Sequence, residues 1–171
     1  MLPWPPLFRA ARAMASAVLS YGAALALALP QPVWAPVSAL VVAQDRLPDT
    51  LRSFRGRLIG TALGVAIAMA VHLLLYPLGA PPLLVLGVAT GLASLLASVW
   101  PAWRVCLWTA AITLLGHPPE MSILASGLAR FLEVTLGACI ATAIAALEFR
   151  SLVALGRSPS REKGGDTPGG G

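Results

Sequence analysis

Two stretches decide the fold of this chain: RLIGTALGVAIA at residues 57–68 and RFLEVTLGACIA at residues 130–141. Five of their twelve aligned positions are identical, and each stretch begins with an arginine before it continues into an apolar run. Long apolar runs are typical of helices that cross a lipid bilayer. The similarity of the two stretches therefore predicts two related halves. Each half would end on a membrane helix whose repeated stretch begins with an arginine.

The composition indicates an integral membrane protein. The 171 residues are 57% hydrophobic and 11% charged, with a mean hydropathy of +0.79, whereas soluble domains are roughly 45–50% apolar and about 25% charged. Because each crossing needs about 20 residues, several crossings would occupy almost the whole chain. The net charge of +5 is distributed in a way that indicates membrane orientation rather than nucleic-acid binding.

Apolar runs separated by prolines predict an all-α integral membrane bundle with six transmembrane helices. We expect these helices at residues 10–29, 33–45, 57–77, 81–99, 102–116 and 121–148. The second is short, since about 12 apolar residues rise only about 18 Å as a helix. The expected domains are a cytoplasmic N-terminal segment (1–9), the six-helix membrane domain (10–150) and a disordered cytoplasmic tail (151–171) that lacks apolar content.

The basic residues predict the orientation of the bundle. If all six segments cross, every Lys and Arg except Arg130 falls on one side, and the opposite loops at 30–32, 78–82 and 117–120 carry none. By the positive-inside rule, both termini are then cytoplasmic. We expect the N-terminal segment to be retained rather than cleaved as a signal peptide, because its loss would break this pattern. The third and sixth helices would run in opposite directions, as in a 3+3 inverted repeat.

Arg130 and Glu133 are the only charged residues well inside an apolar run. Their i,i+3 spacing places them on one helix face, where they can pair and lower the cost of burial in the membrane. Two interpretations stay open at this point. The pair is either a structural salt bridge or an anion-binding arginine with a counter-ion or proton-linked glutamate.

Four other residues are candidates for contact with a solute. Arg57, at the expected cytoplasmic start of the third helix, either sets topology and meets lipid headgroups or belongs to a basic vestibule for organic anions. Trp34 is an interfacial anchor, unless the neighbouring Pro36 opens a cavity beside it. Ser38 and Gln44 add a hydroxyl and an amide to the short second segment.

Small residues at four-residue spacing predict faces where helices pack closely in lipid. The glycines that supply these faces are Gly60, Gly64, Gly87, Gly91 and Gly137. Helix packing is the first interpretation, and a self-association face or a backbone-lined path is the alternative.

The sequence contains no constellation typical of a soluble enzyme. It has no Ser/His/Asp set, no HExxH and no glycine-rich phosphate loop, and its two cysteines lack metal-ligand spacing. We therefore expect no enzymatic activity, no cofactor, no metal and no nucleic-acid partner. The expected partners are the lipid bilayer and a small organic anion.

The segment LPQPVWAPVSALVVAQ at residues 29–44, followed by a charged loop and RLIGTALG at 57–64, resembles the fusaric acid resistance and aromatic acid exporter superfamily. The later RFLEVTLG at 130–137 is similar to the motif that closes the six-helix unit of that family. The resemblance covers residues 10–148. It implies efflux of aromatic or other organic carboxylic acids across a bacterial inner membrane.

The resemblance also bears on assembly, because plant aluminium-activated malate transporters belong to the same superfamily. They imply two subunits around an anion path lined by basic residues. Many related exporters carry a cytoplasmic domain or a second six-helix unit, so we expect this chain to work as a homodimer or with a partner membrane subunit. The leading hypothesis is a subunit of an organic-acid efflux transporter, and the alternatives are a non-transporting accessory or scaffold subunit and a passive anion channel.

Overall fold

The computed structural model describes residues 6–116 and 119–154, and all regular elements in those ranges are helical. The α-helices are α1 (Pro6–Ala26), α2 (Trp34–Val42), α3 (Leu47–Leu75), α4 (Pro82–Val99), α5 (Val105–Leu115) and α6 (Ile123–Ala154). Short 3-10 helices, η1 (Tyr76–Leu78) and η2 (Pro101–Trp103), follow α3 and precede α5. The order and number of the α-helices agree with the sequence prediction.

Three helices are long and apolar enough to cross a membrane within the described residues. They are α3 with η1, α4 and α6. The helices α2 and α5 have 9 and 11 residues, which rise about 14 and 17 Å, well short of a hydrocarbon core of about 30 Å. The described chain is therefore all-helical with three helices able to cross a membrane, and six complete crossings stay a prediction.

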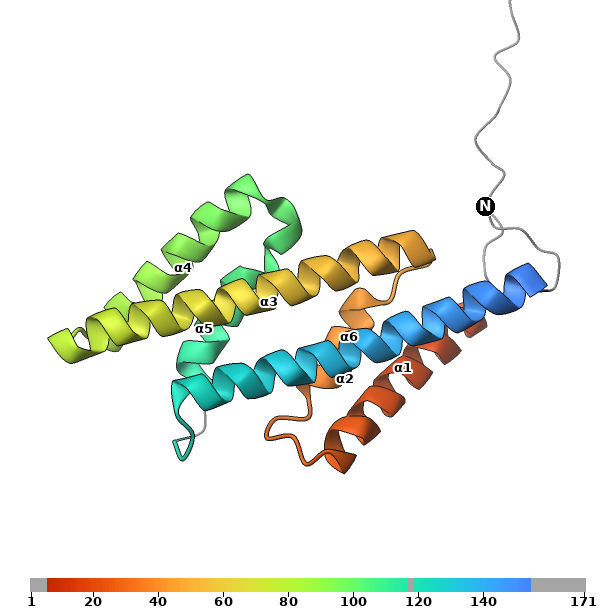
Figure 1. The fold of residues 1–171 in the computed structure, drawn as a ribbon, viewed down its shortest axis with the longest axis horizontal. Helices are drawn as coiled ribbons and strands as arrows, with labels where there is room; N and C mark the ends of the chain where they lie inside the picture. Colours follow the sequence, from red (N-terminus) through yellow and green to blue (C-terminus); the bar gives the residue numbers. More distant parts are fainter. Residues whose placement is uncertain (1–5, 117–118, 155–171) are drawn as a thin grey trace, which may run out of the picture.

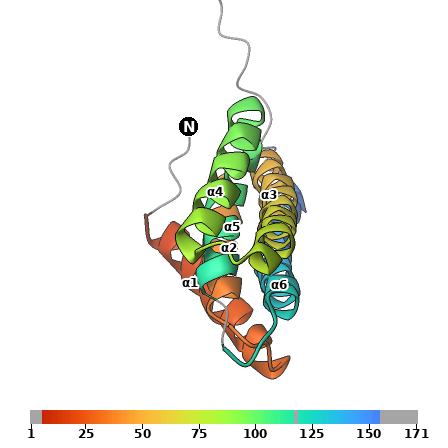
Figure 2. The same ribbon diagram turned by 90° about the vertical axis from the view of Figure 1, so that its left-hand side faces the viewer.

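The long helices α3 and α6 lie side by side and run in opposite directions (Figure 1). The short helices α2 and α5 pass steeply between the longer ones, and Figure 2 shows them near the centre of the bundle. α1 packs against α2 and α6, whereas α4 packs against α5 and α3. The outer helix α1 therefore lies beside α6, and the outer helix α4 lies beside α3.

Each short helix packs most extensively against the long helix of the other half. α2 lies on α6, and α5 lies on α3. The two glycines that align in the repeated sequence sit at these two contacts. A Cβ at Gly64 would come within 2.8 Å of the Cys106 carbonyl oxygen on α5, and a Cβ at Gly137 would overlap the Ala35 carbonyl oxygen on α2. This reciprocal arrangement supports the inverted repeat, which itself stays a prediction.

α3 begins ten residues earlier than the hydropathy predicts, at Leu47 rather than at Arg57. Pro48 in the first turn and Asp49 beside the positive end of the helix dipole both favour a helix start there. Arg57 consequently lies inside the helix and is buried, with 4% of its surface exposed. The expectation that Arg57 begins the third helix is wrong.

The boundaries at the chain ends also differ from the sequence prediction. α1 already includes residues 6–9, and α6 continues through residues 151–154. Residues 1–5 and 155–171, which include most of the expected disordered tail, lie outside the described residues.

Gly87 and Gly91 contact no other helix of the described chain, since a Cβ at either position would meet nothing within 4 Å. They provide no close approach between helices in the chain itself. The alternative of a self-association face stays open for these two glycines. Gly60 of α3, in contrast, packs against α5, because a Cβ there would come within 2.9 Å of the Val105 Cβ.

We predict that Gly64→Ala and Gly137→Ala each lower the free energy of unfolding by about 1–3 kcal/mol, because an added methyl forces a close helix pair apart. Unfolding of the purified protein in mixed micelles measures this. Gly22→Ala on α1 is the matched control and should be neutral or slightly stabilising, since a Cβ there would meet nothing within 4 Å and alanine favours helix by about 1 kcal/mol over glycine. Equal losses at all three positions would contradict the assigned packing.

Candidate functional site

Arg130 and Glu133 are both buried in α6, with 3% and 1% of their surfaces exposed. Their charged groups attract each other, but the direct salt bridge, which was one of the two interpretations, does not form among the described residues. Gln31 bonds both of them instead, Arg130 through its side chain and Glu133 through its backbone. Gln31 Oε1 accepts a hydrogen bond from Arg130 Nη2 at 2.9 Å, and the Gln31 backbone N–H donates to Glu133 Oε1 at 2.6 Å.

Trp34 completes this cluster from the first turn of α2. The Arg130 guanidinium carbon lies 3.9 Å from the centroid of the Trp34 ring, a cation–π contact. The indole Nε1 donates to Gln31 Oε1 at 3.0 Å. Trp34 is therefore more than an interfacial anchor, because its ring covers one face of a buried cation. We call Gln31, Trp34, Arg130 and Glu133 the arginine cluster.

The arginine cluster retains unused hydrogen-bonding groups. Within the described chain, Arg130 Nε and Nη1 and Glu133 Oε2 are buried and have no hydrogen-bond partner. An unpaired polar group inside an apolar protein costs about 1–3 kcal/mol, and more when it is charged. A guanidinium with two free nitrogens is equipped to bind an anion.

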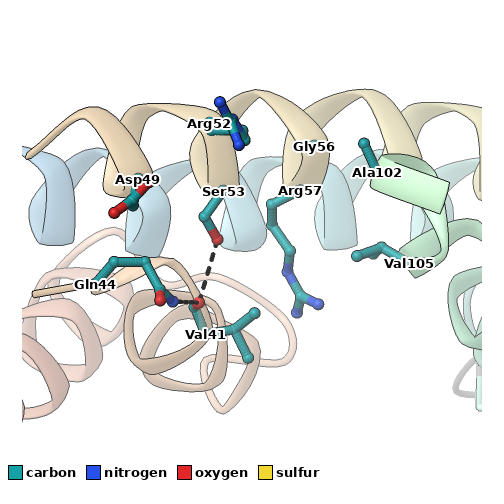
Figure 3. Close-up of a pocket in the computed structure, with 9 residues that line it drawn as sticks. All are labelled: Val41, Gln44, Asp49, Arg52, Ser53, Gly56, Arg57, Ala102 and Val105. Carbon is teal, nitrogen blue, oxygen red and sulfur yellow. Dashed lines mark hydrogen bonds between the residues drawn. The ribbon is translucent and has the colours of Figure 1, made fainter. Parts of the chain in front are cut away.

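Arg57 lines a cavity of about 440 Å³ at the end of the bundle where α3 begins (Figure 3). The cavity is lined by Val41, Gln44, Asp49, Arg52, Ser53, Gly56, Arg57, Ala102 and Val105. In Figure 3 the Arg57 side chain points away from Arg52 and toward the space between α3 and α2. Gln44 is exposed at the rim, and its Nε2 donates to the Val41 carbonyl at 3.2 Å.

The two arginines that begin the repeated stretches share the interior of the bundle. The positive charge of Arg57 repels that of Arg130, although they lie on different helices. Arg57 Nε is buried and has no hydrogen-bond partner among the described residues. An anion between or beside these two cations would relieve the repulsion.

Two threonine hydroxyls extend this polar interior. Thr61 lies one turn beyond Arg57 on the same face of α3, and its Oγ1 is buried and unpaired, as is Oγ1 of Thr113 on α5. Thr113 and Val65 both approach Gly127, which is one turn before Arg130. Arg57, Thr61, Thr113 and Arg130 thus all carry buried polar atoms without a hydrogen-bond partner in the described chain.

Ser38 is buried, but its hydroxyl is committed to helix packing. Its Oγ donates to the carbonyl oxygen of Val134 on α6 at 2.8 Å. The bond ties α2 to α6 one turn from the arginine cluster. Ser38 therefore positions the short helix, and its hydroxyl does not face the cavity.

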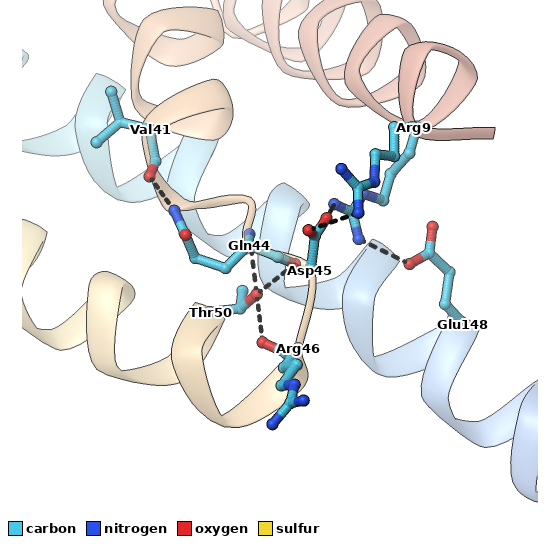
Figure 4. A network of polar contacts seen from close by, with 8 residues as sticks. Arg9, Val41, Gln44, Asp45, Arg46, Thr50 and Glu148 are labelled. Atoms are coloured by element: carbon cyan, nitrogen blue, oxygen red, sulfur yellow. Dashed lines mark hydrogen bonds and ion pairs between the residues drawn. The ribbon is translucent and has the colours of Figure 1, made fainter. Parts of the chain in front are cut away.

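An ion-pair network closes the same end of the bundle as the cavity (Figure 4). Asp45, between α2 and α3, pairs with Arg9 at 3.1 Å and with Arg12 at 3.2 Å, and Arg12 also pairs with Glu148 of α6 at 3.4 Å. Thr50 supports the loop by donating to the Arg46 carbonyl at 3.1 Å. α1, the α2–α3 loop and α6 are thus tied together here.

A family model described as fusaric acid resistance protein-like matches residues 17–144. The chain belongs to this family. The family resemblance predicted from the sequence is confirmed, and it indicates a membrane protein related to transport. No curated protein and no solved structure matched the chain.

For this family member, the structure brings Arg130, Glu133 and Trp34 together and places Arg57 and Gln44 at a separate cavity. Sequence reasoning missed Gln31, although its position between Pro30 and Pro32 marks a polar residue held in a fixed loop. Within the described residues, no group of His, Cys, Asp or Glu side chains could hold a metal ion.

We predict that Trp34 and Arg130 are energetically coupled by about 1–2 kcal/mol, because their cation–π contact is buried. A double-mutant cycle with Trp34→Leu and Arg130→Met, measured by unfolding in mixed micelles, tests this. Trp108 of α5, which is 46% exposed, is the control partner and should show no coupling to Arg130. Additive effects of Trp34→Leu and Arg130→Met would rule out the contact.

Proposed function

We propose that this protein is a membrane transporter subunit that moves organic anions, aromatic carboxylates in particular, out of the cell. Arg130 is the residue that binds the carboxylate. The supporting observation is that two nitrogens of this guanidinium are buried, unpaired and held within the bundle. Intramembrane ionisable residues are costly, and those that persist commonly mark a substrate path.

The cavity at Arg57 serves as the cytoplasmic vestibule. Arg52 and Arg57 line it, and a concave surface with positive charge raises the local concentration of anions. From there the buried hydroxyl of Thr61, one turn beyond Arg57 on α3, would be the next donor on a path toward Arg130. Each of these groups has an unused hydrogen-bonding atom, so a carboxylate meets donors along its way.

Trp34 favours aromatic substrates at the arginine cluster. Its ring already stacks under the guanidinium of Arg130, and an aromatic carboxylate that binds Arg130 can contact the exposed part of the same ring. Glu133 then acts as counter-ion to Arg130 when no substrate is bound. Its Oε2 atom, which has no partner in the described chain, is a candidate for proton uptake linked to transport.

We also propose the membrane arrangement that fits this activity. The protein lies in a bacterial inner membrane with six crossings and both termini in the cytoplasm, where the basic residues gather. It works as a homodimer or with a partner membrane subunit, and the uncovered glycines Gly87 and Gly91 on α4 offer a face for close helix contact.

We predict that proteoliposomes containing the protein take up benzoate faster than empty vesicles, and that Arg130→Ala lowers the rate about tenfold or more, because a charge-assisted hydrogen bond is lost. Arg57→Ala should raise the half-saturating benzoate concentration and weaken its salt dependence, since the vestibule loses charge.

Arg150→Ala, at an exposed position on α6, is the control and should transport as wild type does. Wild-type and Arg130→Ala rates no higher than those of empty vesicles, across aromatic and dicarboxylic acids, would defeat the transporter proposal. Recovery of a stoichiometric partner would then favour an accessory subunit. Currents without a proton gradient would favour a passive channel.

We predict that single cysteines at Ser53 and Ser151 react from the cytoplasmic side, and that those at Leu78 and Ser122 react from the outside. The background carries alanine at Cys106 and Cys139. Labelling of intact cells with a membrane-impermeant maleimide, compared with labelling of opened cells, measures the side. Six crossings would be excluded if residues 78 and 122 labelled on the same side as residue 53.

A further inference from the structure

Arg57 is a buried cation without a compensating partner in the described part of the chain. Only 4% of its surface is exposed, and its side chain takes part in no hydrogen bond or ion pair between described residues. A charge inside a protein needs a counter-charge or strong hydrogen bonds. The surroundings of Arg57 therefore fit an anion that comes from outside the described chain.

The cavity that Arg57 lines is polar on one side and apolar on the other (Figure 3). Its volume of about 440 Å³ lies within the range of about 300–1,000 Å³ that is usual for small-ligand sites. Val41, Ala102 and Val105 form the apolar part of the lining. Val41 is also 43% exposed, so the apolar wall continues to the outer surface of the bundle. This combination fits an amphipathic anion better than a fully polar one.

The carboxylate among the lining residues does not neutralise Arg57. Asp49 lies at an exposed position in the first turn of α3, eight residues before Arg57 and thus about 12 Å from it along the helix axis. Arg52, one turn after Asp49, is also exposed and lines the cavity, so its charge offsets that of Asp49. The lining therefore keeps the positive charge of Arg57.

Two tryptophans indicate that the cavity lies at the level of a membrane interface. Trp100 and Trp103 stack with their ring centroids 4.9 Å apart, and Trp100 is 47% exposed. Gly60 follows Arg57 by one turn, and a Cβ there would come within 3.0 Å of the Trp103 carbonyl oxygen. Tryptophan is enriched at the level of lipid headgroups. The cavity is thus placed where a headgroup can enter it.

We propose that the Arg57 cavity binds the phosphate of an anionic phospholipid headgroup, which supplies the counter-charge that Arg57 lacks. A guanidinium can hold a phosphate through two parallel N–H groups, and Arg52 adds a second positive charge at the rim. The acyl chains would continue along Val41 to the lipid-facing surface. A soluble phosphate would use the cations but not the apolar wall.

This inference goes beyond the proposed function and does not rest on it, since lipid binding involves neither Arg130 nor transport. It does add a consequence for the transporter proposed above. A headgroup at Arg57 would compete with an incoming carboxylate, so the content of anionic lipid in the membrane would set the access to the vestibule.

The test measures lipid binding to the full chain in a non-ionic detergent by native mass spectrometry. Short-chain phosphatidylglycerol should bind the wild type about tenfold more tightly than phosphatidylcholine with the same chains, because only the former has a net negative charge. Arg57→Gln should weaken phosphatidylglycerol binding about tenfold, since a charge-assisted hydrogen bond is lost, and should leave phosphatidylcholine binding unchanged.

Three controls make the result specific. Arg55→Gln removes the same charge from an exposed position on α3 that does not line the cavity, and it should bind phosphatidylglycerol as wild type does. Arg57→Lys keeps the charge without the parallel donors, so it should bind with intermediate affinity, and it replaces Arg57→Gln if that variant does not fold. Glycerol 3-phosphate carries the phosphate without acyl chains and should not displace the lipid at equal concentration.

The outcomes separate this inference from the transporter proposal. Equal losses in Arg57→Gln and Arg55→Gln would indicate general charge attraction and contradict the site. Displacement by glycerol 3-phosphate at equal concentration would overturn the lipid assignment in favour of a soluble phosphate. Arg130→Ala should keep its lipid while it loses benzoate. Absence of selective lipid binding with intact benzoate binding defeats this inference alone, and the reverse result defeats the transporter proposal alone.

Discussion

Burial of the Arg130 guanidinium within an apolar bundle is the constraint on which the rest of the structure depends. A charge in such surroundings must be compensated, and the chain compensates it only partly: with the Trp34 ring, the Gln31 carbonyl and the attraction of Glu133. These partners reach α6 only because α2 approaches it closely. Gly137 permits that approach, since any side chain there would overlap the backbone of Ala35. The fold thus brings polar partners to one cation and still leaves two of its nitrogens free.

The other half of the chain has the same arrangement of an arginine, a glycine and a short helix packed on that glycine, but the surroundings of its arginine differ. Arg57 precedes Gly64 on α3 by the same interval that separates Arg130 from Gly137 on α6, and Gly64 receives α5 as Gly137 receives α2. Arg57, however, borders an open cavity, whereas Arg130 is covered by the α1–α2 loop through Gln31. Both arginines are almost fully buried, and the two halves differ in that Arg57 borders a cavity whereas Arg130 contacts the loop between α1 and α2.

Much of the fold could be predicted from local patterns. Apolar runs and prolines identified the helices, and a lone ionisable pair in an apolar run identified Arg130 and Glu133. The burial of Arg57 was missed because apolar periodicity marked the helix start too late, although Pro48 and Asp49 signalled the earlier start. Gln31 could not be placed, because its partners lie 99 and 102 residues away and loop conformation decides whether they meet. Helix spacing allowed a direct Arg130–Glu133 salt bridge as one of two interpretations, but spacing alone does not include a third residue, Gln31, that bonds both.

The central claim is that Arg130 binds the carboxylate of an organic anion inside the bundle. Equilibrium dialysis of radiolabelled benzoate against the purified protein in detergent measures this without any transport step. The account predicts saturable binding to wild type and to Arg150→Ala, weaker binding to Arg130→Lys because a lysine lacks the two parallel donors, and none to Arg130→Ala. Equal binding by wild type and Arg130→Ala would contradict it.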